Sequence, residues 1–231
     1  MNNPLMCLMI FALGPMEMSA NAQQIPVGMK QYQFVFLRTG PNTNQQEAGV
    51  TDMQEAHLAL LARLNRERVN LLYGPFLEKT DLRGIVVLDL PDAAAARKAL
   101  EKDPFVKEGH LVLDVKPWLA ETNLFGLPDS PNTPEQFALG FLMSGTNRIQ
   151  TAADVEVIQA GHLAYLRDLR KQGKLVVAGP FAEDTNWRGI FIYRVKTVEE
   201  AKELAAGDPA VKAGRLTIDA RPWMTFKGML K

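Results

Sequence analysis

The chain has 231 residues and carries 26 Lys and Arg against 26 Asp and Glu, so its formal net charge is zero. A neutral chain lacks the basic surface that general nucleic-acid-binding proteins use to displace counterions from phosphate, so no nucleic-acid partner is expected. Hydrophobic residues make up 47% of the chain, enough to bury a core, and no apolar run reaches the roughly 18–20 residues of a membrane-spanning helix.

The first 24 residues differ from the rest and resemble a secretory signal peptide. An apolar stretch over residues 4–14 is followed by Ala20-Asn21-Ala22, a small-residue cleavage pattern. No Lys or Arg precedes the apolar stretch, so an N-terminal extension that stays on the protein is the alternative. The prediction is a periplasmic or secreted protein if residues 1–24 are a signal peptide, and a cytoplasmic protein otherwise.

The remaining chain repeats itself at a constant offset. His57 recurs 105 positions later as His162, and residues 57–118 align with residues 162–223 without a gap, with 23 identities in 62 positions. This level of identity indicates a duplication. We predict a first repeat over residues 30–119, a linker rich in proline over residues 120–134, and a second repeat over residues 135–231. Other pairs at the same offset are Gly74-Pro75 with Gly179-Pro180, Arg83 with Arg188, Asp103-Pro104 with Asp208-Pro209, and Pro117-Trp118 with Pro222-Trp223.

Each repeat reads in chain order as strand, helix, strand, strand, helix, strand. Thr51 or Asp52 is the expected cap of the first helix, and Asp154 the expected cap of its counterpart. Each Asp-Pro pair is expected to end the second helix of its repeat, because the residue before proline disfavours the α region. The predicted strands cover residues 32–37, 71–76, 84–90 and 111–115, then 137–142, 174–181, 189–195 and 216–220, and the second helices cover residues 93–100 and 198–206.

This order is that of a ferredoxin-like β-α-β-β-α-β unit, an α+β fold with an antiparallel sheet covered by helices on one face. The other face of the sheet must meet water or another sheet. Alternating apolar residues, among them Phe34 with Phe36 and Phe191 with Tyr193, predict that this face is buried. We expect two tandem repeats packed sheet to sheet as an intramolecular dimeric α+β barrel. Such a chain is a monomeric pseudo-dimer, and further homodimerisation is left open.

Two matched pairs are the candidate catalytic residues. His57 and His162 each lie one helical turn before a leucine pair, and both are kept although the surrounding helix surface has diverged. The alternative for each is a core histidine bonded to a carbonyl group. Asp103 and Asp208 either begin a turn, as Asp-Pro does, or orient the histidine of their own repeat. A carboxylate that accepts a hydrogen bond from one imidazole nitrogen leaves the other nitrogen available for acid–base catalysis.

Two further matched pairs are candidates for substrate binding. Arg83 and Arg188 each begin a strand and either grip an anionic group through two hydrogen bonds or form a surface salt bridge. Gly74-Pro75 and Gly179-Pro180 either make a kink where a strand ends or line a pocket with exposed amides. The matched tryptophans are interpreted as packing anchors.

Several signals for metals and cofactors are absent. The chain has no phosphate-binding loop, no dinucleotide-binding glycine motif, no H-E-x-x-H and no G-x-S-x-G. The single cysteine, Cys7, excludes an intrachain disulfide framework and a thiolate zinc site. His110 has no counterpart, because position 215 is Arg, and it is not counted among the site residues. We therefore expect no metal and no cofactor.

The repeated set of helix histidine, Gly-Pro turn, Asp-Pro-x-Val-x-x-Gly segment and Pro-Trp pair resembles the YCII-related family over nearly the whole chain after residue 30. The resemblance implies a dimeric α+β barrel like that of muconolactone isomerase and a suspected enzyme that uses a His–Asp pair, here the two pairs named above. One relative in the family dehydrochlorinates a chlorinated hydroxyquinol. This chain has Ala210 where its first repeat has Phe105, which predicts two unequal sites if that aromatic side chain lines the pocket.

The expected function is that of a cofactor-free enzyme of lyase, isomerase or hydrolase type that acts on a small-molecule substrate. The alternative is a non-catalytic module of the same fold that binds a small ligand or serves as a scaffold. A direct His–Asp hydrogen bond beside a cavity favours catalysis, whereas an exposed or fully sealed histidine favours the alternative.

Overall fold

The computed structural model describes residues 25–44, 49–130, 133–183 and 186–231. The predicted export signal at residues 1–24 lies outside these ranges. Within them, no helix is long and apolar enough to cross a membrane. The elements are, in chain order, β1 (Met29–Thr39), α1 (Val50–Arg66), β2 (Asn70–Pro75), β3 (Leu82–Leu88), α2 (Ala93–Leu100), α3 (Pro104–Lys107), β4 (Leu111–Glu121), β5 (Pro134–Ser144), α4 (Ala152–Lys171), β6 (Leu175–Pro180), β7 (Trp187–Tyr193), α5 (Val198–Gly207), α6 (Pro209–Lys212) and β8 (Leu216–Phe226).

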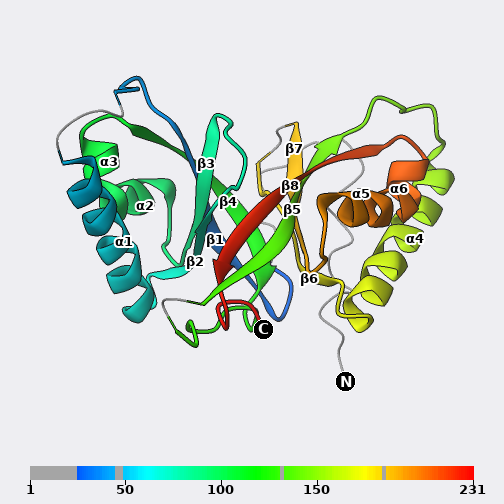
Figure 1. The fold of residues 1–231 in the computed structure, drawn as a ribbon. Helices are drawn as coiled ribbons and strands as arrows, with labels where there is room; N and C mark the ends of the chain where they lie inside the picture. Colours follow the sequence, from blue (N-terminus) through cyan, green and yellow to red (C-terminus); the bar gives the residue numbers. More distant parts are fainter. Residues whose placement is uncertain (1–24, 45–48, 131–132, 184–185) are drawn as a thin grey trace. The chain divides into compact units, whose positions relative to one another are not determined.

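Each repeat forms one four-stranded sheet. The strand order is β2-β3-β1-β4 in the first sheet and β6-β7-β5-β8 in the second. β3 pairs antiparallel with β1 and β2, and β7 does the same with β5 and β6. In each repeat the helices cover one face of the sheet (Figure 1). This is the split βαβ arrangement, so the predicted α+β class and the two tandem β-α-β-β-α-β repeats are confirmed.

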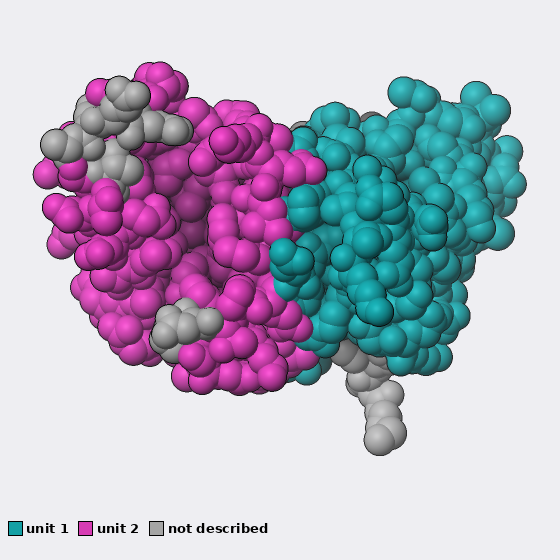
Figure 2. All heavy atoms as spheres, viewed as in Figure 1, with its two compact units in different colours: residues 1–30, 118–124, 136–222 teal, residues 31–117, 125–135, 223–231 magenta. Residues whose placement is uncertain are grey.

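The chain divides into two compact units whose boundaries differ from those of the repeats. Unit 1, teal in Figure 2, holds residues 118–124 and 136–222 with the described residues up to Lys30. Unit 2, magenta, holds residues 31–117, 125–135 and 223–231. The end of β8 therefore belongs to the unit built on the first repeat, and the end of β4 belongs to the unit built on the second.

The two long helices begin differently from the predicted caps. α1 follows Gly49, whose φ of 104° is left-handed and which offers no side-chain cap, so neither Thr51 nor Asp52 caps this helix. α4 follows Thr151, whose hydroxyl accepts a hydrogen bond from the backbone N–H of Asp154, while the Asp154 carboxylate accepts one from the N–H of Thr151. Asp154 is thus the N3 residue of a capping box, and Thr151 is the N-cap. Its hydrogen bonds with the hydroxyl and backbone N–H of Thr151 lower its pKa.

Each Asp-Pro pair begins a helix. α2 finishes at Leu100, and Asp103 is the N-cap of the short helix α3, with Pro104 at its first position. Asp208 caps α6 in the same way, directly after α5. The prediction that each pair ends the preceding helix is confirmed for α5, whose C-cap is Asp208, whereas α2 ends before Asp103. The prediction did not include α3 and α6, because proline is as favourable at the first position of a helix as it is unfavourable further in.

Phe191 and Tyr193 also differ from prediction, because they face the helices and not the opposite side of the sheet. Both belong to a buried cluster that includes Leu166 and Leu169 of α4 and Ala201 of α5. In the aligned repeats these aromatic residues correspond to Val86 and Leu88. At these two positions the second repeat therefore has larger side chains between its sheet and its helices than the first repeat has.

Candidate active site

His57 and Asp103 meet in the first repeat. Nδ1 of His57, on α1, lies 2.5 Å from Oδ2 of Asp103, at the start of α3. Asp103 is buried, and His57 is 9% exposed. Among the described residues, Nε2 of His57 has no hydrogen-bond partner. The pairing fixes which ring nitrogen carries the proton in the neutral imidazole and leaves the other as the acceptor.

The second carboxylate oxygen of Asp103 has a structural task. Oδ1 accepts a hydrogen bond of 3.0 Å from the backbone N–H of Phe105 and so caps α3. Asp103 therefore caps a helix, where a turn was one expectation, and also pairs with the histidine of its own repeat. Because one oxygen is held by the helix N-terminus, the other is fixed in direction toward the imidazole.

The second repeat contains the same couple. Nδ1 of His162 lies 2.7 Å from Oδ2 of Asp208, and Oδ1 of Asp208 accepts a hydrogen bond of 2.8 Å from the N–H of Ala210. The sequence offset of 105 residues thus preserves a three-part geometry of imidazole, carboxylate and helix cap.

The surroundings of the two histidines are different. The ring of His57 meets the edge of Phe105 at 5.5 Å between centroids. His162 is only 2% exposed, and its ring stacks on Phe191 at 6.2 Å. Ala210 stands where Phe105 would be, and it is fully buried in the core of unit 1. The predicted inequality of the two sites is therefore present in the packing around each imidazole.

A glycine makes room for the larger aromatics of unit 1. A Cβ at Gly140 would lie 3.3 Å from the ring of Tyr193 and 3.8 Å from Cβ of Phe191. The aligned position in the first repeat is Val35, beside the smaller Val86. The second repeat has thus exchanged side-chain volume between β5 and β7, and the added aromatic ring lies against His162.

His57 borders a pocket of about 650 Å³ in unit 2, within the size range of small-molecule sites. Figure 2 shows this face of unit 2 hollowed. α1 contributes Gln54, His57, Leu58 and Leu61, α3 contributes Phe105, and β4 contributes Leu111. The rest of the lining comes from three places: the sheet (Leu37, Thr39, Tyr73, Gly74, Pro75, Arg83, Gly84 and Ile85), nearby loops (Asn42, Thr43, Asn44, His110 and Pro134) and the end of β8 (Met224, Thr225 and Phe226).

The candidate binding residues of the first repeat all reach this pocket. Arg83, Gly74 and Pro75 line it together with His57, whereas Asp103 stands behind the imidazole and is not part of the lining. In the second repeat, Arg188 is half-buried at the start of β7, and Gly179 and Pro180 are buried at the end of β6.

The glycines of the Gly-Pro pairs permit a close approach of two backbones. A Cβ at Gly74 would lie 1.8 Å from the carbonyl oxygen of Met224, and one at Gly179 would lie 2.3 Å from that of Leu119. Pro75 still pairs with Gly84 in the sheet, so the strand does not end at the glycine. The pair accommodates the strand end that passes beside it, and this role accompanies its place in the pocket lining.

His110 lines the same pocket as His57 although it was not among the predicted site residues. Its ring lies 5.9 Å from that of Phe105. Its Nδ1 donates to the backbone oxygen of Asn42 at 2.9 Å, which ties the loop after β1 to the segment before β4. The internal repeat gives no indication of His110, because Arg215 occupies the matched position. The available signal in the sequence was the position of His110 directly after Gly109 in the Asp-Pro segment.

Two tyrosines, the buried Tyr193 and the partly buried Tyr165, lie close enough to Asp208 to feel its charge. Burial, followed by the charge of Asp208, raises the pKa of Tyr193 well above its ordinary range. The same two causes raise the pKa of Tyr165. Tyr165 also donates a hydrogen bond of 2.8 Å to the carbonyl oxygen of Leu204. The charge of Asp208 therefore favours the neutral form of both phenols.

The protein is thus a tandem of two ferredoxin-like repeats, each with a His–Asp couple. Residues 34–119 and 141–224 both match the YCII-related domain, and the chain belongs to that family. Over 68 residues it is 31% identical to the uncharacterized protein YjpA of Bacillus subtilis strain 168, a match that covers 29% of this chain and 78% of YjpA.

Solved structures with the same fold have little sequence in common with the chain. A haem-binding protein of Thermus thermophilus is similar with a TM-score of 0.56 at 10% identity, over 86% of this chain and 92% of that one. A mutant chlorite dismutase of Candidatus Nitrospira defluvii is similar with a TM-score of 0.57 at 8% identity, over 86% and 90% of the two chains. At such identities the likeness concerns the fold alone.

Proposed function

We propose that the protein is an enzyme of lyase, isomerase or hydrolase type that moves a proton on a small organic molecule in the pocket of unit 2. One observation carries the proposal: Nδ1 of His57 is held by a buried carboxylate while the ring borders a pocket of about 650 Å³. A histidine oriented in this way directs the lone pair of its other ring nitrogen, which is what a general base requires.

The chemical step follows from the tautomer. With the proton on Nδ1 donated to Asp103, Nε2 of His57 takes a proton from an acidic C–H of the substrate. In a hydrolysis it takes the proton from a water molecule instead, whose oxygen adds to a carbonyl carbon and displaces the leaving group. The electron pair released from a C–H bond forms a new double bond, which expels a leaving group in an elimination or shifts an existing double bond in an isomerisation. Asp103 stabilises the imidazolium that forms, and Nε2 then returns its proton to the leaving group or to the second carbon.

We assign the couple of the second repeat to structure and not to turnover. His162 is sealed between its carboxylate and the ring of Phe191, in a core where the first repeat has a pocket wall. The hydrogen bonds to Asp208 satisfy two buried polar groups and cap α6, which are sufficient reasons for the pair to persist.

The test is a screen of small lactones, chlorinated phenols and hydroxylated aromatic acids in D₂O, read by NMR for turnover and for deuterium uptake at carbon. His57→Ala is expected to abolish both signals, and His162→Ala, the matched control, to retain them in the folded fraction. Equal rates in the wild type and His57→Ala would reject the assignment. Binding without turnover across the whole panel would favour the second candidate.

The second candidate is ligand binding without proton transfer, and haem is the ligand to try first. Histidines that bind a metal through one ring nitrogen commonly donate a hydrogen bond from the other nitrogen to a carboxylate, which orients the ring. The pairing of His57 Nδ1 with Asp103 has this arrangement. A bound haem would supply iron for redox or oxygen chemistry. Titration with haemin, followed by absorbance, tests this: a spectrum that His57→Ala abolishes and His162→Ala keeps would support haem as the ligand.

A further inference from the structure

The charges around the pocket of unit 2 restrict what it can bind. Of the described residues that line it, Arg83 alone carries a formal charge, and none is an aspartate or a glutamate. We infer that the ligand is a small aromatic carboxylate whose carboxylate group binds the guanidinium of Arg83. This inference rests on the pocket of the proposed function and adds its substrate class.

A β-bulge directs Arg83. In the β1–β3 register, Leu37 pairs with Gly84, whereas the next residue, Arg38, pairs with Leu82. Arg83 is therefore the extra residue on β3, and such residues turn their side chains away from the regular alternation of the strand. The same step recurs in the second sheet, where Leu142 pairs with Gly189 and Met143 with Trp187.

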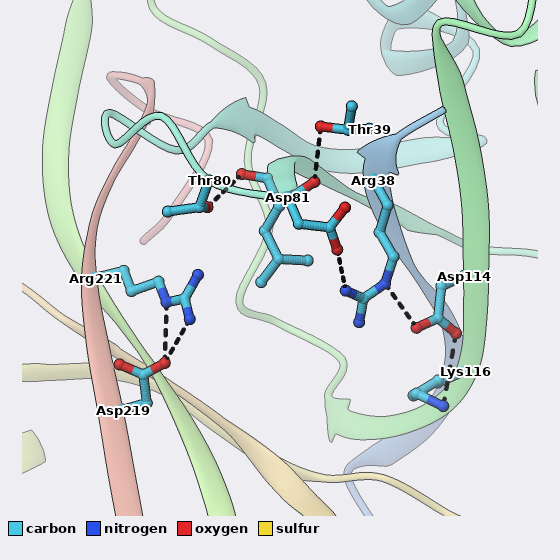
Figure 3. A network of polar contacts seen from close by, with 9 residues as sticks. Arg38, Thr39, Thr80, Asp81, Asp114, Lys116, Asp219 and Arg221 are labelled. Carbon is cyan, nitrogen blue, oxygen red and sulfur yellow. Dashed lines mark hydrogen bonds and ion pairs between the residues drawn. The ribbon is translucent and has the colours of Figure 1, made fainter. Parts of the chain in front are cut away.

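A comparison with the neighbouring arginine shows that the charge of Arg83 is available. Figure 3 shows Arg38 between two carboxylates: its Nη1 lies 2.7 Å from Oδ2 of Asp81, and its Nε 3.2 Å from Oδ2 of Asp114. The side chain of Arg83 is exposed, and within the described ranges it forms no ion pair. A guanidinium with unused donors at the wall of a pocket is suited to a carboxylate held through two hydrogen bonds.

Aromatic side chains form other parts of the lining. The rings of Tyr73 and Phe226 meet at 5.6 Å with an interplanar angle of 61°, and Phe105 meets His57 edge-on. Such faces and edges favour an aromatic ring over an aliphatic chain of the same size. Burial raises the pKa of Tyr73, so its phenol stays neutral and adds no negative charge that would repel an anion.

The end of β8 fixes this aromatic wall. The hydroxyl of Thr225 donates a hydrogen bond of 2.7 Å to the carbonyl oxygen of Tyr73, and Met224 and Phe226 on either side line the pocket. The end of β8 is thus held to the edge strand β2 by a buried hydrogen bond.

Calorimetric titration with three probes of similar size tests the inference: benzoate, the uncharged benzamide and the non-aromatic cyclohexanecarboxylate. We expect benzoate to bind the wild type at least about tenfold more tightly than either of the others, since each lacks one of the two recognised features. Arg83→Gln should weaken benzoate binding by about tenfold or more, Arg83→Lys should restore part of it, and Arg188→Gln should leave it unchanged.

Equal affinity for benzoate and benzamide, unchanged affinity in Arg83→Gln, or no benzoate binding to the wild type at millimolar concentration would each overturn the inference. Circular dichroism of each variant checks that it is folded. His57→Ala separates this inference from the proposed function: it should still bind benzoate through Arg83, so a failure of proton transfer and a failure of anion recognition give different results.

Discussion

The indole N–H of Trp223 donates a hydrogen bond of 2.9 Å to the carbonyl oxygen of Gly74, although the two residues are 149 positions apart in the sequence. In the other unit, Trp118 donates to Gly179 at 2.8 Å. The matched pairs of the duplication, Gly-Pro and Pro-Trp, are therefore partners in one contact. Each tryptophan is a packing anchor, as predicted from the sequence, and also the donor that satisfies the carbonyl of the glycine beside it.

Gly74→Ala should destabilise the protein, because its new Cβ would lie 1.8 Å from the carbonyl oxygen of Met224. Backbone atoms cannot give way as a flexible side chain does, so we expect a loss of roughly 1–3 kcal/mol in the free energy of unfolding. Urea denaturation measures it, with the exposed Glu78→Ala as control. An unchanged midpoint for Gly74→Ala would show that the strand end does not pack as described.

Removing each histidine should have different effects on stability. His162→Ala leaves Asp208 buried without its partner and removes the ring stacked on Phe191, so a loss of about 3 kcal/mol or more is expected. The space left by His57→Ala is continuous with the pocket, so water can reach Asp103 there. We expect this variant to lose about 1–2 kcal/mol in the free energy of unfolding. Chemical denaturation of both variants decides the matter, and equal losses would contradict the structural assignment of the second couple.

Phe191→Val, which restores the residue type of the first repeat, should open space beside His162. The lost ring volume is expected to cost about 1–3 kcal/mol of stability. The imidazole should also react faster with diethyl pyrocarbonate, as measured by mass spectrometry of the peptide that contains His162. Ile190→Val removes volume at the neighbouring position of the same strand and serves as control. Equal reactivity in the two variants would mean that Phe191 does not shield the histidine.

Stability should decline at alkaline pH through Tyr32. Burial, followed by the charge of Asp89, raises the pKa of Tyr32 to about 12, against the opposing effect of Arg68. The unfolded chain loses this proton near pH 10 and the folded protein keeps it, so the folded state binds more protons between these values and stability falls as the pH rises.

Urea midpoints of the wild type and of Tyr32→Phe, measured from about pH 8 to about pH 11.5, test this prediction. The variant should show a shallower decline above about pH 10, and the two curves should run parallel below about pH 9, where the phenol is protonated in both states. Parallel curves over the whole range would exclude a contribution from Tyr32.

The duplication made the His–Asp couples predictable, since an internal repeat acts as a comparison between two related sequences. His57 and Asp103 were identified because His162 and Asp208 recur at the same offset. His110 was missed for the same reason, since it has no counterpart and its relation to the pocket depends on how the loop after β1 folds back.

The inequality of the two sites was only partly predictable. The change from Phe105 to Ala210 was visible in the sequence, but the side on which Phe191 lies depends on the register of β7 against β5. A shift of one residue reverses the face of every side chain on a strand, and apolar residues on both faces of these strands left the choice open. The predicted N-caps of the two long helices were wrong for a similar reason: several polar residues near each helix start can occupy the cap position.

The wall formed by Met224, Thr225 and Phe226 is encoded in the second half of the gene, while the residues that it serves, His57 and Arg83, are encoded in the first. A fragment that stops at residue 119 would carry His57 and Arg83 without this part of the pocket lining. Recombination that deleted one copy would therefore damage the surviving copy as well. Natural selection is then expected to keep both halves in a single open reading frame.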